Sequence, residues 1–148
     1  MVLKEFKIMQ IFLLQHSYKI SGHCDEGKYI GLFSSLEKAK RTINKLKCQE
    51  GFKKHKNRFS IDRYIVDQVF WKQNIKYQNS KNFNKKKIYQ LEYDIWEDNL
   101  CEIINIVGLF SSKKRANNAV RKIKNKKRLL LQSVLVNQVS WEDGFFTG

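Results

Sequence analysis

An internal repeat is the feature that most constrains how this chain folds. The segment "YIGLFSS" at residues 29–35 recurs as "IVGLFSS" at residues 106–112. The same shift of 77 positions also places Cys24 on Cys101. Similarity at one fixed spacing is typical of a repeated supersecondary unit, so the sequence predicts two copies of one small unit in tandem.

The second copy is shorter than the first by a single deletion. Beyond the shared helix the shift falls to 70 positions, which places Val66 on Val136 and Trp71 on Trp141. A loss of seven residues from one loop accounts for both shifts. We therefore predict a first repeat over residues 1–75, a basic polar linker over residues 76–87 and a second repeat over residues 88–148.

Each copy has the residue pattern of a β-β-α-β unit. Runs rich in β-branched and aromatic residues predict strands over residues 11–19 and 88–96, and second strands that end at each serine pair. The following helix carries an apolar stripe, from Leu36 to Leu46 in the first copy. Third strands are predicted over residues 59–67 and 129–139. The expected fold is α+β, with an antiparallel sheet or sheets, two helices packed on one side and a pseudo-twofold axis. The copies either bury their faces together or share one continuous sheet.

The serine pair marks the start of each helix. Ser34 and Ser111 are predicted as N-caps, whose side chains accept a hydrogen bond from a backbone N–H in the first turn. Glu37 follows Ser34 at the capping-box spacing, whereas Lys114 has this place in the second copy. The alternatives are an anion site at the helix N-terminus and a nucleophilic serine. The sequence lacks both a Gly-Lys-Ser/Thr phosphate loop and a Gly-x-Ser-x-Gly elbow, which favours the structural role.

The chain is strongly basic, with a formal net charge of +15. Such an excess favours phosphate backbones, anionic lipid heads or an acidic protein surface as the partner. The competing explanation is a coding bias, because the chain is rich in Lys, Asn and Ile and has no proline. No apolar run approaches the roughly 18–20 residues that span a bilayer. We therefore expect a cytoplasmic protein without membrane contacts. The scattered cysteines predict reduced thiols, no metal site and no cofactor.

The two copies together resemble a family of small bacterial domains of unknown function, which usually occur singly. The first copy carries "HSY" at residues 16–18, "IGLFSS" at residues 30–35 and "GFKKHKNRF" at residues 51–59. The second copy carries "VGLFSS" and the family-like ending "WEDGF" at residues 141–145, but lacks the Gly-Phe…His loop. The resemblance implies no established activity. Some members look like neighbours of toxin systems, which implies an immunity-type binder.

The sequence favours a binding protein over an enzyme, because no pair of carboxylates and no nucleophile–base pair occurs in both copies. Our first hypothesis is an immunity-type inhibitor that binds an acidic protein partner, such as a bacterial toxin domain. The alternative is a nucleic-acid-binding protein that uses the basic face of the second helix, since residues 113–128 hold nine basic residues and no acid. The candidate contact residues are Arg115, Arg121, Lys124, Arg128, Phe52, His55, Trp141 and Phe145.

Overall fold

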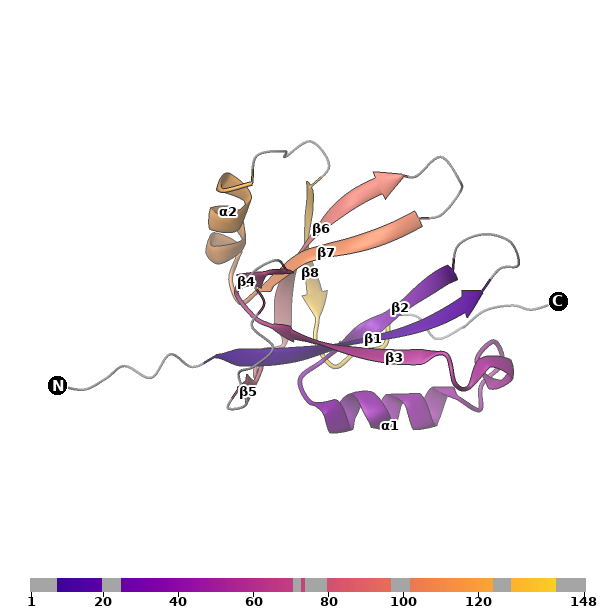
Figure 1. The fold of residues 1–148 in the computed structure, drawn as a ribbon. Coiled ribbons are helices and arrows are strands. Elements are labelled where there is room, and N and C mark those ends of the chain that lie inside the picture. Colours follow the sequence, from indigo (N-terminus) through magenta and orange to yellow (C-terminus); the bar gives the residue numbers. More distant parts are fainter. Residues whose placement is uncertain are drawn as a thin grey trace.

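The computed structural model describes residues 8–19, 25–70, 73, 80–96, 102–123 and 129–140. Over these residues the chain forms two sheets and two α-helices (Figure 1). The α+β class predicted from the sequence is confirmed.

Two series of elements follow one another along the chain. The first half, as we call it, comprises β1 (Met9–Lys19), β2 (Asp25–Phe33), α1 (Leu36–Leu46) and β3 (Phe59–Ile65), with a short 3₁₀ helix η1 (Lys53–His55) before β3. The second half comprises β6 (Lys87–Trp96), β7 (Glu102–Phe110), α2 (Lys113–Arg121) and β8 (Leu129–Leu135). Two short strands lie between the halves, namely β4 (Gln68–Val69) and β5 (Lys81–Asn82).

Each half builds its own sheet around its first strand. Sheet A has the order β2-β1-β3, and β5 pairs in parallel with the start of β1. Sheet B has the order β4-β7-β6-β8. The pairings β1–β2, β1–β3, β6–β7 and β6–β8 are all antiparallel. The two sheets therefore have the same local topology.

The sheets also share an irregularity. The β1–β2 register shifts between Leu14 and Gln15, and the β6–β7 register shifts between Leu91 and Glu92. Both bulges lie beside the repeated glycine, since Leu14 pairs with Gly31. A bulge bends a strand and increases its twist, so both sheets curve at equivalent places.

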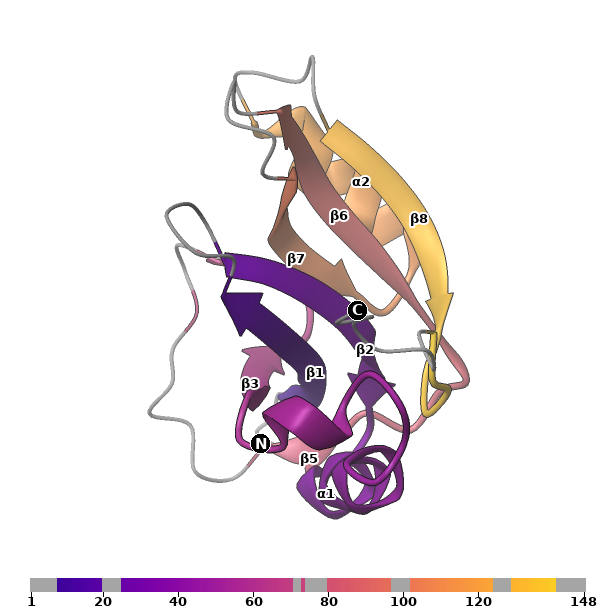
Figure 2. The same cartoon turned by 90° about the vertical axis from the view of Figure 1, so that its right-hand side faces the viewer.

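The two sheets face one another, and each helix covers the outer face of its own sheet (Figures 1 and 2). The central core lies between the sheets and contains buried side chains such as Leu13, Leu32, Ile88 and Leu109. Two outer cores lie under the helices, one with Ala39 and Leu46 of α1 and the other with Ala116 of α2. Fully burying one such Leu or Ile contributes about 1.5–3 kcal/mol.

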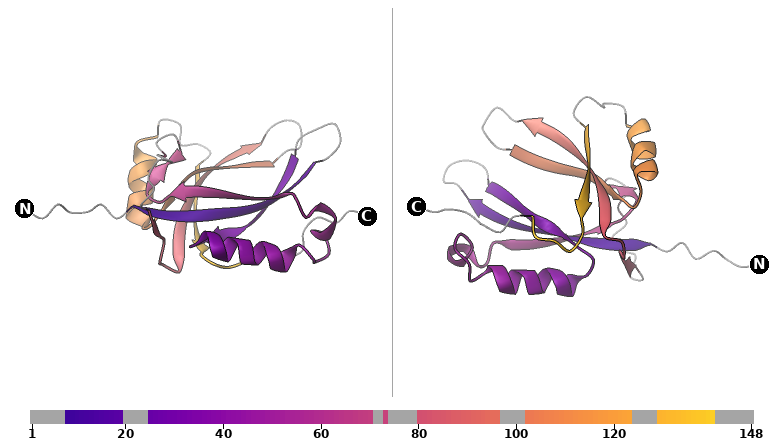
Figure 3. Two further views of the ribbon diagram at one scale, coloured as in Figure 1. Left: turned by 60° about the horizontal axis from the view of Figure 1, so that its bottom comes forward. Right: turned by 180° about the vertical axis from the view of Figure 1, so that it is seen from behind.

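The position of the helices corrects one sequence expectation. The two helices do not share one side of a sheet, because each apolar stripe packs on the strands of its own half. The other face of each sheet is then left for the partner sheet, so the two halves bury their faces together (Figure 3). The range predicted as a polar linker also contributes to this core, because Phe83 is fully buried there.

Candidate functional site

The end of the third strand in each half crosses to the other half. We call residues 66–69, which follow β3, the first joint. The last two of these residues form β4 at the edge of sheet B. The Asp67 backbone N–H donates to the Leu109 carbonyl oxygen at 2.8 Å. The Asp67 carboxylate accepts the Ser111 backbone N–H at 2.8 Å and its hydroxyl at 2.7 Å. The first joint therefore fixes the start of the α2 segment with a residue of the first half.

The second joint repeats this exchange in the opposite direction. Residues 136–140 follow β8 of the second half but pack along β2 of the first half. The Asn137 backbone N–H donates to the Leu32 carbonyl oxygen at 2.7 Å. The Asn137 side chain accepts the Ser34 backbone N–H at 2.8 Å and donates to its hydroxyl oxygen at 3.1 Å. Each half thus supplies the segment that completes the other.

The repeated glycine leaves room for the crossing backbone. A Cβ atom at Gly31 would overlap the backbone carbonyl oxygen of Gln138. A Cβ atom at Gly108 would lie 3.0 Å from the carbonyl oxygen of Gln68 and 2.8 Å from the Phe110 ring. The Gly-Leu-Phe-Ser-Ser segment therefore contacts the crossing segment at each joint. Its glycine lets the two backbones approach closely, and its first serine forms the hydrogen bonds.

The prediction that Ser34 and Ser111 cap the helices is wrong by one residue. The N-caps are Ser35 and Ser112, which have the extended backbone that an N-cap requires. In α1 the Ser35 hydroxyl oxygen accepts the Lys38 backbone N–H at 3.2 Å, and α2 has the equivalent bond at the same distance. Either serine of each pair could cap its helix. The first serine is hydrogen-bonded to Asn137 or Asp67 at its joint, so the second serine forms the cap.

This register also removes the predicted capping box. The third residue after the Ser35 cap is Lys38, so Glu37 is not at the position from which a side chain returns to the cap. Glu37 still lies in the first turn of α1, where a negative charge is favourable.

A groove lies beside the first joint, between α2 and β4, and has a volume of about 540 Å³. Its apolar lining comes from Val69, Phe110, Ala119 and Ile123, and its polar lining from Asp67, Gln68, Arg115, Asn118 and Lys122. Arg115 lies 3.8 Å from the Asp67 carboxylate, but its side chain is 65% exposed. The groove therefore combines an apolar surface with two exposed cationic side chains.

The structure brings together only part of the predicted contact set. Arg115 and Arg121 are exposed on α2, and Arg115 lines the groove. Four other predicted residues lie outside the described part of the chain, namely Lys124, Arg128, Trp141 and Phe145.

Phe52 is a correction, because its side chain is fully buried and cannot be a surface contact. Its ring packs edge-on against the buried His16 ring, with centroids 4.9 Å apart, and stacks on Phe59 at 5.5 Å. The His16 Nε2–H donates to the His55 backbone carbonyl oxygen at 2.9 Å. The loop that contains Phe52 and His55 thus closes the outer core of the first half, while His55 itself is partly exposed.

Burial lowers the pKa of His16 below its usual value of 6.5. The hydrogen bond to His55 acts in the opposite direction, and the charges of His55 and Arg58 add to the lowering. A neutral His16 is therefore part of the folded state at neutral pH.

The sequence interpretation did not find the groove residues that come from the first half. Asp67 was assigned to the end of the third strand of its own half, and Gln68 and Val69 were placed only within the first repeat. A signal was present, because Val66, Gln68 and Val69 align with Val136, Gln138 and Val139 around a residue that is Asp or Asn. Asp67 and Asn137 have φ of 68° and 65°, a conformation in which Asp and Asn are enriched.

The described residues show neither a metal centre nor a membrane-crossing helix. No group of three or more His, Cys, Asp or Glu in this part of the chain is placed to hold a metal ion. None of the described helices has both the length and the apolar character that a membrane crossing requires. Cys48 is an exposed free thiol.

Comparison with protein-family models finds a domain of unknown function, DUF7336, at residues 9–75. This range begins at β1 and extends beyond β4, so it includes the segment that forms the first joint. Searches of curated proteins and of solved structures each gave no match.

Proposed function

We propose that this chain, whose residues 9–75 carry a domain of unknown function, is a non-enzymatic binding protein. In this proposal the groove between α2 and β4 holds an acidic segment of a protein partner. The most concrete form of such a protein is an immunity-type inhibitor of a bacterial toxin domain. The observation that carries the proposal is the combination of an apolar groove with a cationic rim.

The apolar surface supplies affinity in this proposal. Val69 of β4, Phe110 of β7 and Ile123, which follows α2, meet at the groove. An apolar side chain that enters such a groove is removed from water and contributes about 25 cal/mol per Å² of buried apolar surface. Protein interfaces gain most of their binding energy from a few anchors of this kind.

The charged rim supplies selectivity. Arg115 and Lys122 line the groove and are exposed. The Asp67 carboxylate lies 3.8 Å from Arg115 and offsets part of this charge, so the groove lining carries two cations and one anion. Complementary charge steers an acidic partner to the groove and disfavours a basic one. The net charge of +15 acts in the same direction at longer range.

The predicted tandem duplication is part of this proposal. The shared element order, the matching bulges and the reciprocal joints support an origin of the two halves as copies of one domain. The groove lies at one joint and is lined by residues in which the copies differ, such as Asp67 against Asn137. Duplication followed by divergence would give a symmetric scaffold with one specialised surface.

A second candidate function is nucleic-acid binding by the basic face of α2. The observation that favours it is the run of nine basic residues and no acid over residues 113–128. Lys113, Arg121 and Lys122 are exposed on the described part of this face. Such a surface neutralises phosphates and gives an affinity that falls steeply with salt.

Arg121, the last residue of α2, and Lys122, its C-cap, separate the two candidates. Both are exposed, but Lys122 lines the groove and Arg121 does not. For a protein partner, tested first with the product of the neighbouring gene, Lys122→Glu should raise the Kd about tenfold or more, and Arg121→Glu should have a much smaller effect. Equal effects of the two variants would remove the groove from the interface. The absence of a stoichiometric complex with that product would exclude the immunity-type form.

The nucleic-acid candidate is tested by a salt-titrated gel shift with mixed DNA and RNA. Binding should be strongest near ~50 mM salt, and both charge reversals should weaken it similarly because both remove phosphate contacts. If no complex forms at this salt concentration, α2 is not a phosphate-binding surface.

A further inference from the structure

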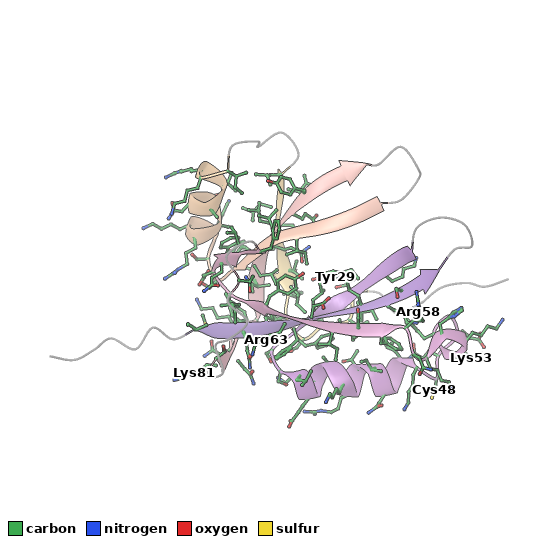
Figure 4. The ribbon with its side chains drawn as sticks, in the orientation of Figure 1. Tyr29, Cys48, Lys53, Arg58, Arg63 and Lys81 are labelled. Atoms are coloured by element: carbon green, nitrogen blue, oxygen red, sulfur yellow. The ribbon has the colours of Figure 1, made fainter. Side chains whose placement is uncertain are left out.

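A cluster of polar side chains lies between the two sheets, away from the groove. Tyr29 of β2 contributes from sheet A, and Gln90, Glu92 and Gln132 contribute from strands β6 and β8 of sheet B. Figure 4 shows Tyr29 on the side of β2 that faces sheet B. Gln90 is 2% exposed and Glu92 is 9% exposed, whereas Tyr29 is half-buried and Gln132 is exposed, so within the cluster Gln90 and Glu92 are the residues removed from water.

Glu92 is a buried carboxylate that only neutral groups contact. Gln90 Nε2 donates to one carboxylate oxygen at 2.9 Å, and Gln132 Nε2 donates to the other at 3.3 Å. Within the described residues, no Lys or Arg forms an ion pair with Glu92. A carboxylate taken out of water without a cation is costly, and two amide hydrogen bonds compensate for this only in part.

Two further polar atoms in the cluster have no hydrogen-bond partner among the described residues. One is Gln90 Oε1, which must be the oxygen because the nitrogen of the same amide faces the Glu92 carboxylate. The other is the Tyr29 hydroxyl. Burial raises the pKa of Tyr29, and the Glu92 charge and Tyr64 raise it further, so this hydroxyl stays protonated. The cluster therefore has one negative charge and an unpaired amide oxygen, and its one unpaired donor, the Tyr29 O–H, bonds neither of them.

The first half shows that the fold does not need a polar residue at two of the four cluster positions. The 77-position shift places Gln90 on Leu13, which is fully buried in the central core. It also places Tyr29 on Ile106, a buried apolar residue of the same core. The residues equivalent to Gln90 and Tyr29 in the other half are thus apolar. The fold therefore accepts an apolar side chain at both positions, and the polar residues there are not required for folding.

We propose that the cluster of Tyr29, Gln90, Glu92 and Gln132 is a binding site for an organic cation that carries N–H donors, either an alkylammonium or an alkylguanidinium group. The cation pairs with the Glu92 carboxylate and donates to Gln90 Oε1 and the Tyr29 hydroxyl oxygen. The Tyr29 ring adds a favourable aromatic face for a desolvated positive charge. Gln132 is exposed and gives the route from solvent to the carboxylate.

The test is a titration of the full chain with agmatine, followed by NMR of glutamine side-chain amides. Saturable shifts are expected for the amide signals of Gln90 and Gln132, which bind the Glu92 carboxylate directly. Butylammonium should give similar shifts, because it shares the charge and the donors. Tetramethylammonium has the same charge without donors and should bind more weakly. Sodium chloride at the same ionic strength should give no saturable shift.

Variants decide whether Glu92 carries the site. Glu92→Gln keeps the shape but removes the charge, and should weaken agmatine binding about tenfold or more. Glu50→Gln is the matched control, because it removes the same charge from an exposed residue that is paired with Lys53. Tyr29→Phe breaks no hydrogen bond of the ligand-free chain and should weaken binding by a smaller factor.

Two results would overturn the proposal. One is the absence of a saturable shift below about 10 mM agmatine. The other is unchanged affinity in Glu92→Gln, which would place the cation elsewhere on the chain.

Discussion

Asp67 at the first joint and Asn137 at the second joint have nearly the same backbone conformation and make the same pair of contacts to a serine. Each accepts a serine backbone N–H at 2.8 Å, and each also binds the serine hydroxyl. The difference is charge. Asp67 is a carboxylate that accepts both bonds, whereas the amide of Asn137 accepts one and donates the other.

This difference shows that the hydrogen bonds to serine are the structural feature of the joint and that the charge of the side chain can vary. Both side chains fulfil the structural role, so the fold requires a short acceptor at positive φ and not a charge. The carboxylate at the first joint adds a charge to the groove and lies near Arg115. The joint therefore tolerates either an amide or a carboxylate, and at the first joint the carboxylate offsets part of the positive charge of Arg115.

The largest effect should come from filling the space at the repeated glycine. Gly31→Ala places a methyl group on the Gln138 carbonyl oxygen, so backbone must move, and we expect a loss of about 3 kcal/mol in the free energy of unfolding. Gly108→Ala meets the buried Phe110 ring at 2.8 Å but the Gln68 carbonyl oxygen only at 3.0 Å, so less backbone movement is needed, and it should cost about 1–2 kcal/mol. Urea unfolding of both variants gives the comparison, and equal losses would show that the second joint is no tighter than the first.

Removing the acceptor of each joint should have the next largest effect. Asp67→Gly and Asn137→Gly both keep a residue that tolerates positive φ, so they isolate the lost side-chain bonds. We expect a loss of about 2–3 kcal/mol at Asp67, because hydrogen bonds to a charged group are the stronger ones, and about 1 kcal/mol at Asn137. Thermal unfolding measures both, with Ser111→Ala as a companion that removes one of the two Asp67 bonds. A larger loss at Asn137 would reverse our ranking of the joints.

The sequence predicted the local elements well because local patterns determine them. Alternating residues in β3 and the apolar stripe of α1 were sufficient for strand and helix. The choice between Ser34 and Ser35 as the cap could not be made from local rules, because either serine satisfies them. Asn137, 103 positions away, decides it by taking the backbone N–H of Ser34.

The exchange of segments and the groove could not be predicted in the same way. Residues 59–67 look like one strand, and the break after Ile65 depends on β7 offering a free edge to residues 68–69. Pairing with a distant edge leaves little trace in the local sequence. Phe52 was misplaced for a related reason, since its loop is present in the first copy alone and was therefore predicted as a contact surface, although the ring packs on His16.

A third prediction compares the outer cores of the two halves at acidic pH. His16 lies under the loop of the first half, and the equivalent residue of the second half is Tyr93. The folded-state pKa of His16 is lowered, so the unfolded chain binds the proton more readily. The stability that a neutral His16 provides is present above pH 6.5 and is lost as the pH falls below that value. Urea unfolding at pH 7.5 and 5.5 should show this loss in the natural chain and a smaller one in His16→Phe. A loss of the same size in His16→Phe would assign the effect to other groups.

The smallest effect concerns the first turns of the two helices. Glu37 lies in the first turn of α1, whereas α2 has Lys114 at the equivalent place and no acid in its first turn. The N-terminus of a helix carries a partial positive charge, so Lys114→Glu should stabilise the chain by about 0.3–1 kcal/mol and Glu37→Lys should destabilise it by a similar amount. Thermal unfolding at low and high salt tests this, because screening should reduce both changes. Lys114 does not line the groove, so Lys114→Glu should leave partner binding unchanged apart from a small effect on the association rate. A large loss of binding in Lys114→Glu would extend the interface from the groove to the whole basic face of α2, as phosphate binding requires.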